Sequence, residues 1–175
     1  MPKNSKTVAM RKETGEPGDP FSDLGRHAVE EICGHLRKLL ADVFALYLKT
    51  KNFHWHMKGK HFRDYHLLLD EQSDQIFAMT DDVAERARKL GGTTLRSIGD
   101  IVRHQRLHDN DHDSPSCKEM ISELHDDNVT LTKYMREVHE VCDKYKDVAT
   151  TSMIEIWIDQ TERRSWFLAE VSADL

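Results

Sequence analysis

Metal-ligand residue types recur on one side of a long stretch that contains no helix breaker. Residues 61–90 include no Pro and no Gly, so this segment predicts a single helix of about eight turns. His66 and Asp70 are four residues apart and therefore share one side of such a helix. Asp81 and Glu85 form a second pair with the same spacing. Imidazole and carboxylate groups together are typical ligands of a divalent transition metal, so the stretch indicates two candidate half-sites.

The two half-sites cannot meet on one straight helix. Asp70 and Asp81 are roughly 16 Å apart at a rise of about 1.5 Å per residue, too far for one metal ion. Two antiparallel copies of the helix, related by a two-fold axis at residues 75–76, would reunite them. His66 then faces Glu85 of the other copy, and Asp70 faces Asp81. Such a dimer has two equal sites built from both chains. The alternative is that these acids form the solvated face of a charged helix.

The stretch before this helix predicts another long helix. Ser22 or Asp23 could cap its start, and apolar residues at helical spacing continue to about His54. Gly34 lies inside the helix and predicts close packing against a neighbour. The pair at residues 91–92 supplies a glycine that can take the left-handed conformation common at helix ends.

The second half of the chain predicts one short helix and two long ones. Residues 98–107 are a short amphipathic segment. Residues 116–119 form a capping box that opens a third long helix, and a fourth follows Asp147. Four long helices without a strand pattern predict an all-α antiparallel bundle. A di-iron site inside one bundle needs Glu-x-x-His, and no Glu in this chain has His three residues later.

The region from His54 to Gly92 resembles the signature of the Dps-type mini-ferritins. The resemblance lies in His54-Trp55, the turn Gly59-Lys60-His61-Phe62, His66 with Asp70, the run from Asp81 to Arg86, and Leu90-Gly91-Gly92. It implies a ferritin-like four-helix bundle, with a short extra helix between the second and third helices. It also implies assembly into a hollow shell of twelve subunits.

The resemblance further implies a ferroxidase, with two-iron centres at two-fold interfaces between subunits. His54, His66 and Asp70 would come from one subunit. Asp81 and Glu85 would come from its partner. The implied substrates are Fe²⁺ and hydrogen peroxide, and the oxidised iron would collect as ferric mineral inside the shell.

Four further residues are candidates for accessory roles. By resemblance, Trp55 lies against the iron centre and could be oxidised in place of other targets. His56 stands where the family often has Asn, and it could add a ligand or only a hydrogen-bond donor. Glu71 and Asp74 are candidates for nucleating the mineral, and are equally well explained as plain surface acids.

The chain divides into a tail, residues 1–21, and one bundle domain, residues 22–175. The tail is rich in Pro and Gly and begins with a cluster of Lys and Arg, so it predicts either a mobile arm that contacts DNA phosphates or a solubilising tail. An alternative function is therefore structural binding and compaction of DNA, against which the net charge of −6 argues. A bundle without iron chemistry is a third possibility. No signal peptide or membrane span is evident, which predicts a cytoplasmic protein, associated with the nucleoid if it binds DNA.

Two other groups of possible ligands have a simpler explanation. An acidic stripe on the last helix could line the cavity or a three-fold pore that draws in Fe²⁺, or could be only a solvated face. A loop rich in His and Asp could bind stray metal, although a solvated acidic loop explains it better. These groups are Glu155, Asp159 and Glu162, and His104, His108 and His112.

Overall fold

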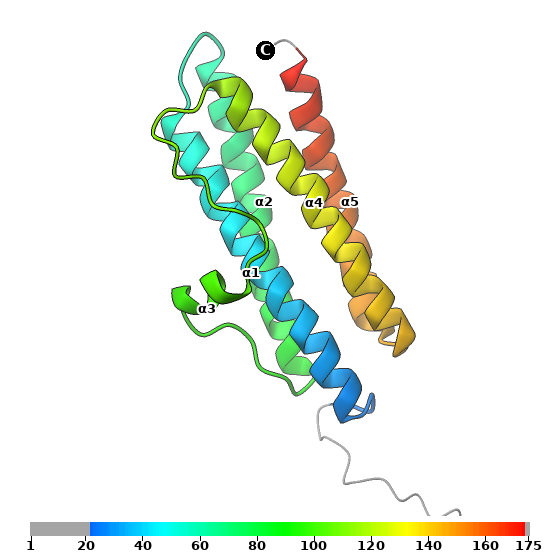
Figure 1. The fold of residues 1–175 in the computed structure, drawn as a ribbon. Helices are drawn as coiled ribbons and strands as arrows, with labels where there is room; N and C mark the ends of the chain where they lie inside the picture. Colours follow the sequence, from blue (N-terminus) through cyan, green and yellow to red (C-terminus); the bar gives the residue numbers. More distant parts are fainter. Residues whose placement is uncertain (1–21, 174–175) are drawn as a thin grey trace, which may run out of the picture.

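Five helices make up the computed structural model, which describes residues 22–173 and contains no strand within them (Figure 1). The helices are α1 Arg26–His56, α2 Phe62–Lys89, α3 Ile98–His104, α4 Cys117–Lys144 and α5 Val148–Ser172. Helix α1 packs along α2, α4 packs along α5, and the two hairpins meet mainly through α1 and α4. The predicted all-α bundle of four long helices with a short extra helix is confirmed.

The connection between α2 and α4 runs the length of the bundle. Both helices run in the same direction in Figure 1, so the chain must return from the end of α2 to the start of α4. Helix α3 lies on this crossover and packs against α1. A single long crossover distinguishes ferritin-like bundles from simple up-and-down bundles.

Four helix ends agree with the sequence prediction. Helix α2 begins and ends within one residue of the predicted 61–90, and Gly91 follows it with φ of 90°. Ser116 and Glu119 form the predicted capping box of α4. Asp147 caps α5 by accepting a hydrogen bond from the Thr150 backbone N–H at 3.1 Å.

The predicted start of the first helix is wrong. Neither Ser22 nor Asp23 caps α1, whose N-cap is Gly25 with φ of 81° and no side-chain hydrogen bond. The Ser22 hydroxyl instead accepts a hydrogen bond from the backbone N–H of Leu24 at 3.2 Å, and so stabilises a local turn. Only glycine adopts the positive φ of Gly25 at little cost, so the chain turns into the helix there.

The close packing predicted at Gly34 is also wrong. A Cβ atom at Gly34 would meet no atom within 4 Å, so this side of α1 has room for a side chain. The close approach is instead between Cys33 and Gly92, where an added Cβ would lie 2.2 Å from the Cys33 Sγ. Gly92 therefore lets the turn after α2 pack directly on α1.

The short helix ends earlier than predicted, at His104 instead of residue 107. The carboxylate of Asp42 on α1 is fully buried and accepts hydrogen bonds from the backbone N–H groups of Arg106 and Leu107. It also accepts from Nε and Nη2 of Arg106, at 2.9 and 2.7 Å. These bonds hold the chain against α1 in a non-helical conformation.

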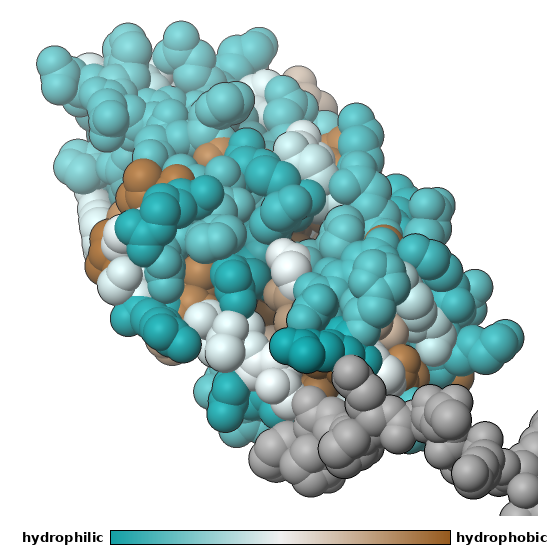
Figure 2. Space-filling view, turned by 60° about the horizontal axis from the view of Figure 1, so that its bottom comes forward, coloured by the Kyte–Doolittle hydropathy of each residue, from teal (hydrophilic) through white to brown (hydrophobic). Residues whose placement is uncertain are grey.

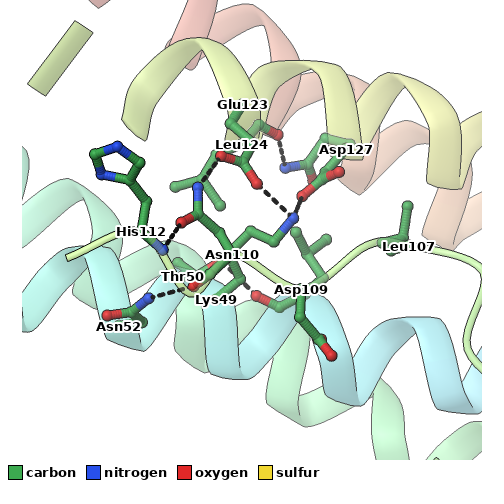
Figure 3. Close-up of polar contacts among 12 residues, drawn as sticks. Lys49, Thr50, Asn52, Leu107, Asp109, Asn110, His112, Glu123, Leu124 and Asp127 are labelled. Carbon is green, nitrogen blue, oxygen red and sulfur yellow. Dashed lines mark hydrogen bonds and ion pairs between the residues drawn. The ribbon is translucent and has the colours of Figure 1, made fainter. Parts of the chain in front are cut away.

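A polar network fastens the rest of the crossover to the bundle (Figure 3). The Lys49 ammonium is buried between Glu123 at 2.8 Å and Asp127 at 2.7 Å, which joins α1 to α4. Asn110 donates to the Glu123 carboxylate at 2.5 Å, and its side-chain oxygen accepts from the backbone N–H of His112 at 2.8 Å. The loop is therefore held by hydrogen bonds to protein groups.

The end of the bundle where α1 begins has a mostly hydrophilic surface, with small separated hydrophobic patches (Figure 2). In residues 22–173, no helix is long and apolar enough to span a membrane.

Candidate metal centre

Two histidines hold each other in place where α1 ends and α2 begins. The rings of His54 and His66 stack with centroids 3.7 Å apart and planes 17° apart. Nδ1 of His54 lies 2.8 Å from the backbone oxygen of His66, and Nδ1 of His66 lies 2.9 Å from the backbone oxygen of His54. A carbonyl oxygen can only accept, so each Nδ1 carries the proton. Nε2 is then the ring nitrogen left to bind a metal, through its lone pair.

The turn between the helices brings these two rings together. Gly59 has φ of 120°, a conformation that glycine adopts readily, and lets the chain reverse within a few residues. Met57 and Phe53 are buried beside the turn and attach it to the core. The stack is therefore fixed by the same packing that closes the α1–α2 hairpin.

Asp70 lies one turn beyond His66 and completes this half of the site. Its Oδ1 is 3.8 Å from Nε2 of His54, so a carboxylate oxygen and an imidazole nitrogen lie side by side. A hydrogen bond from Lys51, with the positive charge of that residue, holds the pKa of Asp70 below its usual value. Asp70 is therefore an anion throughout the neutral range.

Lys51 is the cation at this half-site, and sequence reasoning missed it. Its Nζ lies 2.6 Å from Oδ1 of Asp70, and the hydrogen bond raises the pKa of Lys51. The available signal was its position one turn before His54 on α1, which directs both side chains toward α2. A metal ion that binds Asp70 must compete with this ammonium group.

Asp81 and Glu85 lie farther along α2 and do not reach the two histidines. Both are exposed; Glu85 pairs with Lys89 at 2.9 Å, and Asp81 has no hydrogen bond or ion pair with any described residue. Within residues 22–173 of one chain, no three His, Cys, Asp or Glu side chains are grouped so that they could hold a metal ion. The two pairs remain separate half-sites in the single chain.

Large apolar side chains are exposed around both half-sites. The Phe77 side chain, 51% exposed, lies on α2 between the half-sites and packs on Tyr47 with ring centroids 5.0 Å apart. Phe62 is 43% exposed, and its ring lies 4.9 Å from that of His66. Others on α1 and α2 are Leu48, Trp55 and Leu67. Exposed apolar surface of this extent is typical of a protein–protein interface.

The accessory candidates all lie at the surface. Trp55 is 59% exposed. His56 is exposed, and its Nδ1 lies 2.8 Å from the backbone oxygen of Asn52, which again leaves Nε2 available. Glu71 and Asp74 are exposed, and Glu71 accepts a hydrogen bond from the Gln75 amide at 3.0 Å.

Two acids of the stripe on α5 have partners on α4. Glu155 lies 3.1 Å from Nε2 of His139, and Glu162 pairs with Arg136. Asp159 is exposed. Of the three histidines, His104 is the last residue of α3, and its Nδ1 lies 2.8 Å from the backbone oxygen of Asp100.

The described fold is similar to proteins that are already known. The family model for a ferritin-like domain matches residues 33–175. DNA protection during starvation protein 1 from Deinococcus radiodurans is 29% identical over 156 residues, which cover 86% of this chain and 75% of that protein.

Solved structures show the same similarity. Dps from Thermosynechococcus elongatus has a TM-score of 0.80 at 27% identity, covering 83% of this chain and 92% of its own. A Dps protein from Vibrio cholerae O1, described as a member of a broad superfamily of ferritin-like diiron-carboxylate proteins, has a TM-score of 0.81 at 21% identity. This match covers 89% of this chain and 98% of that one, and it supports the fold alone.

Proposed function

Because the chain belongs to the ferritin-like family, and within it to the Dps-type mini-ferritins, we propose that it oxidises Fe²⁺ at two-iron centres shared between subunits. Fe²⁺ is the substrate, and hydrogen peroxide is the oxidant. Two Fe²⁺ each lose one electron, and one peroxide takes both electrons and two protons to become two waters. Consuming the two reagents together protects DNA from the radicals that they would form with each other.

The observation that carries this proposal is the reciprocal contact of His54 and His66. Each ring is held by the backbone of the other residue, so both Nε2 atoms are positioned before iron arrives. Preorganised ligands lose little conformational entropy when a metal ion binds. Asp70 adds an anionic oxygen beside them, and a negative ligand favours the ferric product over the ferrous substrate.

A second copy of the chain supplies the remaining ligands in this proposal. Asp81 and Glu85 are exposed carboxylates on the same helix face, too far along α2 to act on the histidines of their own chain. A two-fold axis across α2 would bring them to the partner's half-site. Phe77, exposed midway along α2, would then be covered at the axis.

The proposed assembly is a closed shell of twelve subunits that stores the oxidised iron as mineral. Glu71 and Asp74 are exposed carboxylates beyond Asp70 and are the proposed nucleation residues. Trp55 is the proposed electron donor when oxidant exceeds iron, since its indole is exposed at the end of α1. His56 could offer a further Nε2 ligand at the same end.

Binding of DNA through residues 1–21 remains a separate proposal, because those residues lie outside the described range. The name of the Deinococcus relative supports a protective role toward DNA for that protein. For this chain we propose protection mainly by chemistry, with the tail adding a salt-sensitive contact. The cytoplasm, where iron and the nucleoid meet, is the proposed compartment.

Anaerobic loading with Fe²⁺ followed by addition of peroxide tests the proposed chemistry. Ferric absorbance should rise rapidly in the native protein, with about two Fe²⁺ consumed per peroxide, and should be strongly slowed in His66→Ala. His27→Ala is the matched control, because the His27 side chain is 84% exposed and far from α2's first turn. Equal rates in the native protein and in His66→Ala would contradict the assignment.

Sedimentation velocity tests the proposed assembly separately. A closed dodecamer should sediment as one large species in the native protein and in His66→Ala, because His66 is not part of the core cluster. A stable monomer under native conditions would contradict a shared site.

A further inference from the structure

A polar cleft of about 540 Å³ lies between α1, the segment that follows α2, and α3. It is separate from the half-site of His54 and His66: Arg37 and His54 are roughly 25 Å apart along α1, at about 1.5 Å per residue. Three arginines, one histidine, three hydroxyl residues and one acid line it. They are Arg37, Thr93, Thr94, Arg96, Ser97, Asp100, Arg103 and His104.

Positive charge exceeds negative charge in this cleft, although the whole chain is acidic with a net charge of −6. Asp100 is the only acid in the lining and pairs with Arg103. The Arg96 side chain has no hydrogen bond or ion pair with any residue in 22–173. The Nε of Arg37 is shielded from water and has no hydrogen-bond partner in the described structure. The Arg96 guanidinium therefore has unused donors at the cleft, whereas the Nε of Arg37 is too buried for a ligand there to reach.

The fold holds the cleft's donors in defined positions. Nη2 of Arg37 donates to the Thr93 hydroxyl at 2.6 Å and to the Thr93 backbone oxygen at 3.3 Å. Because the Thr93 oxygen accepts this bond, its own proton remains free to donate. The Ser97 hydroxyl likewise accepts a bond from the backbone N–H of Asp100 at 3.2 Å and keeps its proton available.

From this cluster we infer that the cleft binds a phosphate group. Arginine forks and hydroxyl donors match the oxygens of phosphate, and arginine is favoured where planar, bidentate recognition is needed. The volume exceeds the need of one phosphate and accommodates two that are linked. The lining contains no Phe, Tyr or Trp on which a nucleobase could stack, so recognition is of the phosphate itself.

Calorimetric titration of the assembled, iron-free protein with inorganic phosphate and with pyrophosphate tests this inference. Both ligands should bind saturably at constant ionic strength, with pyrophosphate tighter. Arg96→Gln should weaken pyrophosphate binding roughly tenfold, as expected for the loss of a charge-assisted contact. The Arg96 side chain has no partner in residues 22–173, and its backbone N–H, which donates to Asp100 at 3.0 Å, is kept in Arg96→Gln, so the shell and its iron oxidation should be unchanged.

Arg63→Gln is the matched control. Arg63 is exposed on α2, so this substitution removes the same charge at a position outside the cleft. It should bind pyrophosphate like the native protein. The inference fails if the native protein shows no saturable binding of either ligand, or if both variants lose affinity equally. Neither readout involves iron, so this result is independent of the ferroxidase proposal.

Competition with a labelled DNA duplex distinguishes the two sources of the phosphate. If pyrophosphate displaces DNA and Arg96→Gln binds DNA more weakly than Arg63→Gln does, the ligand is the phosphodiester backbone. If DNA leaves pyrophosphate binding unchanged, the ligand is free phosphate. Either result supports a phosphate site in the cleft.

Discussion

Replacing Lys51 by Met should increase the affinity of the half-site for Fe²⁺ at neutral pH. The Lys51 ammonium contacts Oδ1 of Asp70 at 2.6 Å and must be displaced when iron binds that oxygen. The Asp70 side chain is 47% exposed, so solvent screens the pair and its contribution is that of a surface salt bridge. The half-saturating Fe²⁺ concentration should therefore fall about two- to fivefold, not by orders of magnitude.

The same substitution should make iron binding more sensitive to acid, although it strengthens binding at neutral pH. Lys51 lowers the pKa of Asp70, so in Lys51→Met that pKa returns toward its ordinary value. Asp70 then gains a proton at a higher pH, and iron binding should be lost earlier as the pH falls. Anaerobic titration of Fe²⁺ between neutral and mildly acidic pH measures both effects, and Lys51→Arg, which keeps the charge, is the control. Weaker binding by Lys51→Met at neutral pH would refute the competition argument.

Three further predictions concern the fold and the tail. Gly92→Ala should destabilise the protein by about 1–3 kcal/mol in urea unfolding, because its Cβ would meet the Cys33 sulfur, and adding Cys33→Ala should restore part of the loss. Arg106→Met should cost about 3–5 kcal/mol, because it removes the cation that pairs with the buried Asp42 carboxylate and leaves only the two backbone N–H donors. Burial already raises the pKa of Asp42, so the loss should be largest at neutral pH and shrink as acid protonates it. Deleting residues 1–21 should abolish gel shifts of DNA at low salt if the tail carries the DNA contact; an unchanged shift would refute that role.

The sequence predicted the helices well because their signals are local. The capping box at Ser116 acts within one helical turn, the run without Pro or Gly predicts one continuous helix, and a helix follows Asp147; the structure confirms all three. The errors arose where contacts between residues far apart in the sequence determine where a helix ends. Residue 107 is outside α3 because Asp42, far away in the chain, takes the N–H groups that a longer helix would use.

For the candidate site, spacing alone indicated the two halves but not how the first is held. The His54–His66 stack depends on two backbone oxygens across a turn, and the pattern of side chains in the sequence does not predict such contacts. Lys51 was missed for a similar reason, since a lysine on a helix is usually solvated. The partnership of Asp81 with a second chain remains a prediction, because it concerns contacts beyond a single chain.

Reassembled mixtures of two inactive variants test the shared site most directly. His66→Ala removes a ligand from one half, and Asp81→Ala removes one from the other, so each pure shell has a lesion in every site. In a dimer of one His66→Ala chain with one Asp81→Ala chain, one site contains both substitutions and the other site contains neither. Random mixing in equal amounts should therefore return about one quarter of native peroxide-driven iron oxidation. If mixed dimers form, as native mass spectrometry can verify, and stay as inactive as the parents, the ligands come from one chain and the shared centre is wrong.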